Sequence, residues 1–236
     1  MSTTDNPTAS SKAAKKDIDA FLHTVADLPP PRAGSDKGRL IFALDATASR
    51  QRTWAQATAL QKDMFLQTRG IGELNVQLAY YRGYGECQAS QWQSDPLSLV
   101  ALMNKVSCVA GRTQIARILK HGISETKIKP VQALVFVGDC CEEDVDALGD
   151  LAGQLKILGL PVFIFQEGFD AHAHAVFSQI ARLSGGAHCR FDQNASAQLG
   201  QLLNAVAAYA AGGRDALVRL KSTGSQSAAQ LLAQLS

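Results

Sequence analysis

Apolar and polar positions alternate along the chain with two different periods. Near-continuous apolar runs, typical of strands buried on both faces, cover residues 39–45, 131–139 and 160–168, with a shorter run at 187–192. Period-two alternation over residues 73–83 predicts a further strand, and the glycines after it predict a turn into an antiparallel partner at 86–92. Elsewhere, apolar residues at helical spacing predict helices over residues 52–68, 95–106, 111–123, 142–159, 174–186 and 196–213.

The order of these elements predicts the fold class. Strands that alternate with helices indicate an α/β domain with a doubly wound, mostly parallel six-stranded sheet and one antiparallel edge strand. We expect this domain to span residues 38–211. Residues 1–37 are expected to form a mobile N-terminal tail with a short amphipathic helix, and residues 212–236 a C-terminal helical appendage.

Composition and charge exclude several classes of function. The net charge of +2 over 236 residues is too mild to indicate nucleic-acid binding. No apolar run approaches the roughly 20 residues that span a bilayer, and the polar N-terminus does not resemble a signal peptide. The five cysteines include no CxxC pair, which favours reduced thiols. We therefore expect a soluble protein located in the cytoplasm.

Oxygen-bearing side chains gather where two apolar strands end. Asp45 closes the first strand and is followed by Thr47 and Ser49; Asp139 closes the next parallel strand, and Thr113 stands near the start of a predicted helix. In a doubly wound sheet, ligands bind beyond the carboxyl ends of the strands where the winding reverses. Two carboxylates and three hydroxyls there predict a site for a hard divalent cation, Mg²⁺ or Mn²⁺.

These residues resemble the metal-ion-dependent adhesion site (MIDAS) of the von Willebrand factor A (VWA) family. The family motif reads D-x-S-x-S, then a Thr in a later loop, then an Asp after the next core strand. Asp45, Thr47 and Ser49 match the first part as D-A-T-A-S, and Thr113 and Asp139 match the others. Thr47 replaces the usual Ser, and Asp139 is followed by a cysteine rather than the common glycine.

The resemblance implies a Rossmann-like VWA fold and a function in protein binding. Thr47, Ser49 and Thr113 would ligate the cation directly, and Asp45 and Asp139 directly or through water. One open coordination position would capture an acidic side chain of a partner protein. The resemblance further implies a non-enzymatic adaptor in complex assembly or with an AAA+ ATPase.

Other interpretations of the same residues compete with this one. Thr47 and Ser49 could serve only to cap the helix that begins near Arg50, or the site could be degenerate and bind no metal. The acids of "CCEED" at 140–144 are expected in the first turn of a helix, where they complement its dipole, rather than in a metal or redox cluster. A zinc site of His172, His174, His188 and Cys189 is considered, but solvated histidines are favoured.

An enzymatic alternative assigns the same acids to catalysis. A haloacid dehalogenase-type phosphotransferase would use Asp45 as nucleophile, Thr113 and Lys129 to bind phosphate, and Asp139 with Asp144 to hold Mg²⁺. Such hydrolases usually carry a second Asp two residues after the nucleophile, and here that position is Thr47. We therefore favour the binding module.

Overall fold

Six strands form one sheet in the part of the chain that the computed structural model describes: residues 17–25, 27–28, 38–52, 54, 74–191, 205–207 and 209–211. They are β1 (Gly38–Asp45), β2 (Leu74–Arg82), β3 (Glu86–Ala89), β4 (Ala133–Gly138), β5 (Val162–Glu167) and β6 (His188–Phe191). The strand order is β3-β2-β1-β4-β5-β6, and only β2 and β3 pair antiparallel. The predicted α/β fold class, with one antiparallel edge strand, is confirmed.

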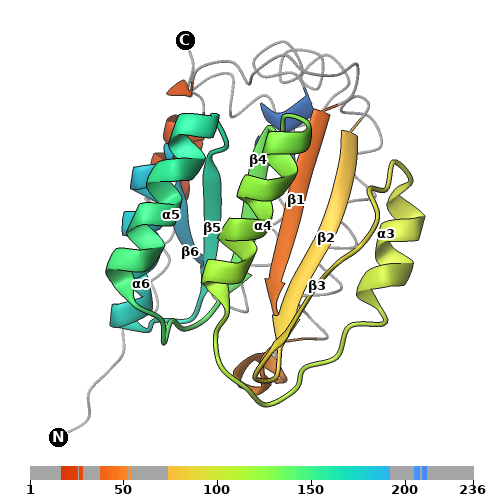
Figure 1. Ribbon diagram of the computed structural model, residues 1–236. Coiled ribbons are helices and arrows are strands. Elements are labelled where there is room, and N and C mark those ends of the chain that lie inside the picture. Colours follow the sequence, from red (N-terminus) through yellow and green to blue (C-terminus); the bar gives the residue numbers. More distant parts are fainter. Residues whose placement is uncertain are drawn as a thin grey trace, which may run out of the picture.

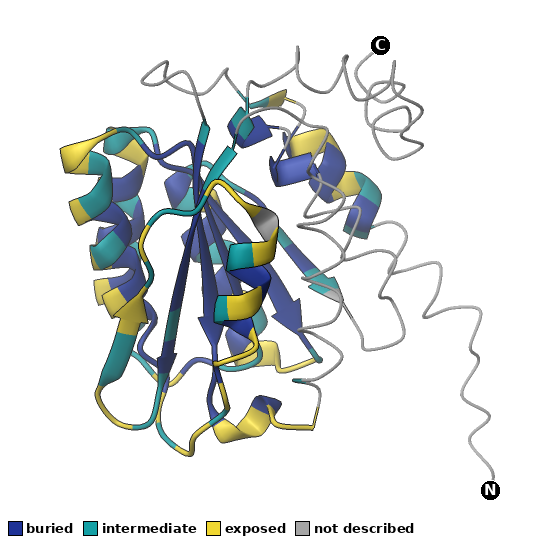
Figure 2. Ribbon diagram, turned by 90° about the vertical axis from the view of Figure 1, so that its right-hand side faces the viewer, coloured by how far each residue is buried: buried dark blue, intermediate teal, exposed yellow. Residues whose placement is uncertain are grey.

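Helices cover both faces of the sheet. On one face lie α4 (Ile115–Ile128), α5 (Val145–Leu158) and α6 (Ala171–Ser184). Figure 1 shows α4 and α5 in front of the strands and α6 at the left, partly behind α5. The helical residues 17–25 and α3 (Pro96–Met103) pack on the opposite face, and Figure 2 shows the buried strands between the two layers.

Successive side chains of β1 point to opposite faces because a strand has a period of two residues. Phe42 joins the apolar core beneath α3, whereas Ile41 joins the core beneath α4, α5 and α6, and neither is exposed. The near-continuous apolar runs therefore reflect strands that bury both faces, as expected of a parallel sheet.

The winding of the sheet reverses at β1. The next strand along the chain, β2, lies on one side of β1, and β4 lies on the other. The register pairs Leu44 with Val137, so Asp45 and Gly138 follow at the same edge. This edge carries the carboxyl ends of the parallel strands and points downward in Figure 1.

The predicted helices agree with the structure where it describes them. Asp95 caps α3 by accepting hydrogen bonds from the backbone N–H groups of Leu97 and Ser98. The helix predicted over 111–123 begins only at Ile115 and continues to Ile128, and residues 111–114 before it have no regular secondary structure. The helix predicted over 52–68 lies almost entirely outside the described residues, and the C-terminal appendage lies wholly outside them. Of the helix predicted over 196–213, only residues 205–207 and 209–211 are described, and they are helical.

The N-terminal helical residues 17–25 pack on the sheet. Phe21 is 2% exposed, and its ring lies 6.1 Å from that of Phe163 and 5.3 Å from that of Phe165 in β5. The division of the chain at residues 37 and 211 stays a prediction, because most of both flanking segments lies outside the described residues. Within the described residues, no helix combines the length and apolarity that crossing a bilayer requires.

Candidate metal centre

Asp45 occupies the end of β1 and is fully buried. Its Oδ1 accepts a 2.8 Å hydrogen bond from the backbone N–H of Thr47, and its Oδ2 accepts a 2.8 Å hydrogen bond from the hydroxyl of Tyr81 in β2. Burial raises the pKa of the Asp45 carboxyl, while these hydrogen bonds and the charge of Arg50 oppose the rise. The carboxylate is thus held in one orientation, at an electrostatic cost.

Thr47 and Ser49 form a pair of hydroxyls beside this carboxylate. Their oxygens lie 3.1 Å apart, and they flank the start of a short 3-10 helix, η1 (Ala48–Arg50). Although Thr47 stands at the N-cap position of η1, its side chain makes no capping hydrogen bond. Helix capping therefore does not explain the Thr47 hydroxyl, and its oxygen is available to bind another group.

Asp139 follows β4 and faces Asp45 across the crevice. One carboxylate oxygen from each acid and the sulfur of Cys140 all lie within 4.8 Å of one another. Oδ1 of Asp139 is buried and has no hydrogen-bond partner among the described residues. Gly138 permits this approach, since a Cβ there would lie 2.7 Å from the ring of Phe136 and 3.5 Å from the Cβ of Asp45.

The carboxylates of the crevice make it unfavourable for further negative charge. Burial together with the carboxylates of Asp139 and Asp45 raises the pKa of the Cys140 thiol to about 12. The same effects, burial first, raise the pKa of the Cys108 thiol to about 11, with only the charge of Arg50 opposing them. A cation placed between the acids would offset the repulsion that disfavours the thiolate form of both residues.

A buried arginine, which the sequence pattern did not indicate as part of the site, holds together the strand ends that form the crevice. Arg50 is fully buried, and its Nε donates to Oε2 of Glu167 in β5 at 3.0 Å. One of its terminal nitrogens donates to the backbone oxygens of Asp45 at 2.8 Å and Val137 at 3.5 Å. Arg50 thereby connects the ends of β1, β4 and β5 with a single guanidinium.

Thr113 is tied to the loop that carries Asp139. Its hydroxyl accepts a 3.0 Å hydrogen bond from the backbone N–H of Glu142, and its own N–H donates to Oε2 of Glu142 at 3.2 Å. A hydroxyl oxygen has two acceptor lone pairs, so one remains for another partner. The structure thus places Thr113 beside the loop of Asp139, while Asp45, Thr47 and Ser49 lie together in one turn.

The acids of the "CCEED" segment differ from their predicted position. They precede α5 instead of forming its first turn, because Asp144 is the N-cap and accepts from the N–H of Ala147 at 2.8 Å. Glu143 instead caps α4, accepting from the N–H groups of Ile115 and, at 2.9 Å, Ala116. The predicted complement to a helix dipole is therefore shared between two helices, with Asp144 at the start of α5 and Glu143 at the start of α4.

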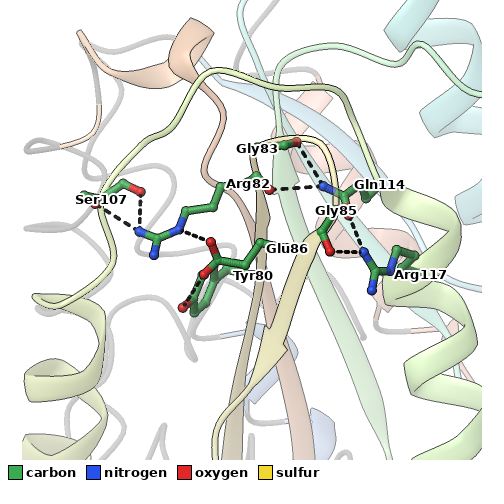
Figure 3. A network of polar contacts seen from close by, with 8 residues as sticks. All are labelled: Tyr80, Arg82, Gly83, Gly85, Glu86, Ser107, Gln114 and Arg117. Atoms are coloured by element: carbon green, nitrogen blue, oxygen red, sulfur yellow. Dashed lines mark hydrogen bonds and ion pairs between the residues drawn. The ribbon is translucent and has the colours of Figure 1, made fainter.

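The loop of Thr113 is fixed on its other side by the β2–β3 turn (Figure 3). The side-chain amide of Gln114 donates to the backbone oxygens of Arg82 and Gly83 at 3.2 and 3.1 Å, and Arg117 donates to that of Gly85 at 2.6 Å. A Cβ on Gly111 would overlap the backbone of Gly83, so only glycine allows the two segments to lie this close.

Comparison with solved structures gives the fold a name. A VWA protein from Catenulispora acidiphila superposes with a TM-score of 0.59 at 13% identity, over 74% of this chain and 43% of that one. Proximal thread matrix protein 1 from the mussel byssus, with a zinc-occupied MIDAS motif, gives a TM-score of 0.60 at 14% identity, over 75% and 47%. An aerotolerance-related membrane protein from Bacteroides fragilis gives 0.54 at 18% identity, over 71% and 98%.

The chain has the fold of a VWA domain. No protein-family model and no curated protein sequence matches it. The chain spans almost the whole Bacteroides chain, but less than half of the Catenulispora and mussel chains.

Within this VWA fold, Lys129 lies far from Asp45, the nucleophile of the phosphotransferase alternative. The backbone oxygen of Lys129 accepts a hydrogen bond from Arg39 at the start of β1. Asp45 stands at the other end of this eight-residue strand, which separates the two by about 20 Å at roughly 3.3 Å per residue. Lys129 therefore cannot bind a phosphoryl group that Asp45 attacks.

The histidines of the VWA fold do not form the zinc site considered above. His172 is exposed, whereas the His174 and His188 rings lie 4.9 Å apart. Both ring nitrogens of His188 are hydrogen-bonded, to Ser178 at 3.0 Å and Gln166 at 3.1 Å. Burial, and then the proximity of His174 and Arg190, lower the pKa of His188 to about 3. Solvated histidines were predicted, and this holds for His172 but not for His188.

Proposed function

We propose that the chain is a non-enzymatic protein-binding module that holds a divalent cation and uses it to capture an acidic side chain of a partner protein. The proposed ligands are Asp45, Thr47, Ser49, Thr113 and Asp139. The observation that carries the proposal is the buried, unpartnered Oδ1 of Asp139 beside the buried carboxylate of Asp45. Two such groups repel one another unless a cation lies between them.

The types of ligand indicate which cations the proposed site accepts. Carboxylate and hydroxyl oxygens suit Mg²⁺ or Mn²⁺, which take six oxygen ligands and usually retain water. Such a retained water is the position that a partner's carboxylate would replace. The mussel protein, which shares this fold, has zinc in its MIDAS motif, and this supports a divalent cation at the corresponding strand ends here.

The proposed partner is a protein that presents an exposed Asp or Glu. The family resemblance makes an AAA+ ATPase the first candidate, with the chain as an adaptor in complex assembly. A reducing compartment such as the cytoplasm suits the five cysteines, all of which are free thiols.

A capture experiment tests the proposal. The immobilised full chain is incubated with a cell lysate, either in about 1 mM Mn²⁺ or with EDTA. A millimolar concentration of the cation is chosen because weak sites for hard cations require it. The retained proteins are compared by mass spectrometry. We expect the specific partners to be lost with EDTA and with Asp45→Asn. Asp150→Asn, on the exposed side of α5, is the matched control and should retain them. Equal retention by Asp45→Asn and the wild type would contradict the proposal.

A further inference from the structure

A thiol stands among the oxygens of the proposed site. The sulfur of Cys140 lies within 4.8 Å of one carboxylate oxygen of Asp45 and one of Asp139, which makes these three side chains a compact ligand set. The neighbouring Cys141 is buried in the core between α4, α5 and the sheet, so the two adjacent thiols point to different surroundings. Among the described residues this is the one group of three or more His, Cys, Asp and Glu side chains with metal-ligand spacing.

We propose that Cys140 supplies a sulfur ligand to the cation held between Asp45 and Asp139, so that this site selects Zn²⁺ over Mg²⁺. This inference rests on the proposed function for the presence of a cation between Asp45 and Asp139. It departs from that proposal in replacing direct hydroxyl ligands with a sulfur ligand, and Mg²⁺ or Mn²⁺ with Zn²⁺. The reason is a cysteine at position 140, where the family pattern commonly has a glycine.

The geometry favours zinc over magnesium. Zinc binds thiolate at about 2.3 Å and carboxylate at about 2.0–2.2 Å, usually with four ligands in a tetrahedron. The ligand atoms of such a tetrahedron lie roughly 3.3–3.8 Å apart, and the three candidate ligand atoms here lie within 4.8 Å of one another, so binding would draw Asp139 and Cys140 toward the fixed carboxylate of Asp45. Mg²⁺ instead requires octahedral oxygen ligands at about 2.0–2.1 Å and gains nothing from a soft sulfur.

Three protein ligands leave the fourth position of a zinc site open. In this arrangement the fourth position can be filled by water or by the carboxylate of a partner, as in other zinc sites that have three protein ligands. The hydroxyls of Thr47 and Ser49 would then hydrogen-bond the ligating carboxylates and orient them. As the zinc–sulfur bond forms, the thiol proton passes to solvent, so that zinc binding is coupled to the release of one proton.

Cobalt spectroscopy tests the sulfur ligand directly. Co²⁺ replaces Zn²⁺ with similar geometry, and a thiolate ligand adds a sulfur-to-cobalt charge-transfer absorption in the near ultraviolet. We expect the wild-type chain to show this absorption on titration with Co²⁺, Cys140→Ser to lack it, and the matched control Cys108→Ser to keep it. Circular dichroism confirms that each variant is folded.

Metal affinities provide the second measurement. Competition with a chelating dye should show that Cys140→Ser weakens Zn²⁺ binding by at least about 10-fold, while Mn²⁺ binding changes less than twofold. A cobalt complex without charge transfer, or one unchanged by Cys140→Ser, overturns the inference and leaves the proposed oxygen site standing. Absence of binding for Zn²⁺, Co²⁺ and Mn²⁺ alike would overturn the proposed function as well.

Discussion

Arg50 offers the sharpest test of how the strand ends are held together. Its guanidinium is fully buried, and it donates to Glu167 and to the backbone oxygens of Asp45 and Val137. We expect Arg50→Met, which keeps much of the side-chain length, to be strongly destabilising. Stability is lost mainly because the buried carboxylate of Glu167 remains. Its side chain is only 7% exposed, and in the variant it would keep its charge without a guanidinium partner.

The magnitude follows from the burial of the ion pair. Breaking a buried pair by removing one partner costs about 3–5 kcal/mol, since an uncompensated charge stays in the interior. At roughly 2–4 °C per kcal/mol for a chain of this size, the melting temperature should fall by about 6–20 °C. Arg82→Met is the matched control. It removes the more exposed pair with Glu86, whose side chains are 21% and 35% exposed, and should change the melting temperature far less.

Urea unfolding of single and double variants separates the stability contributed by the Arg50–Glu167 ion pair from the other effects of each substitution. We expect Arg50→Met and Glu167→Gln each to lower the unfolding midpoint, and the double variant to be less destabilised than their sum. The double variant no longer has a Glu167 charge without its guanidinium partner, so a coupling of about 1–3 kcal/mol is expected. A cost below about 1 kcal/mol for Arg50→Met, or strictly additive losses, would show that the pair does not stabilise the strand ends.

Three further predictions concern the crevice itself. Gly111→Ala should lower the melting temperature and weaken Mn²⁺ binding measured by calorimetry, because the added methyl group displaces the Thr113 loop from Gly83. An unchanged melting temperature together with unchanged Mn²⁺ affinity would contradict this close approach. Saturating Mn²⁺, at about 100 times its Kd, should stabilise the wild type by about 2.7 kcal/mol, and Asp45→Asn should abolish the effect. In the metal-free protein, Asp45→Asn should be the more stable form at pH 7. Because folding raises the pKa of Asp45, the wild type loses stability as the pH rises through that value. The difference should therefore vanish below the ordinary carboxyl pKa, and a difference that persists at low pH would refute this origin.

The fold and the facing acids could be predicted from the sequence because they follow from local patterns. Apolar runs identify strands buried on both faces, and an acid directly after such a run must emerge at the strand's carboxyl end. Parallel strands share that edge, so Asp45 and Asp139 were expected in one crevice, and the structure brings their carboxylate oxygens within 4.8 Å. Whether they bind a cation with the three hydroxyls stays a prediction.

The supporting contacts could not be predicted because they join residues far apart in the chain. Arg50 lies in a polar segment that reads as solvated, and its burial depends on Glu167, 117 residues later. Glu143 was expected to serve the helix that follows it in sequence, yet it caps α4, 27 residues earlier. The partner of a buried charged residue can be identified only when the order of the strands in the sheet is known.

The charges at the strand ends indicate the order in which cation and partner would bind. The carboxylates of Asp45 and Asp139 lie together at these strand ends, and Glu167 pairs with the guanidinium of Arg50, so these four side chains carry a formal charge of −2. An acidic side chain approaching the empty crevice would be repelled, and the repulsion is strong where water is excluded. A divalent cation brings the local charge to zero, or to −1 if the Cys140 thiol gives up its proton, and adds an open coordination position. We therefore expect the cation to bind first, and a partner added without it to show no measurable association at concentrations that saturate the cation-loaded protein.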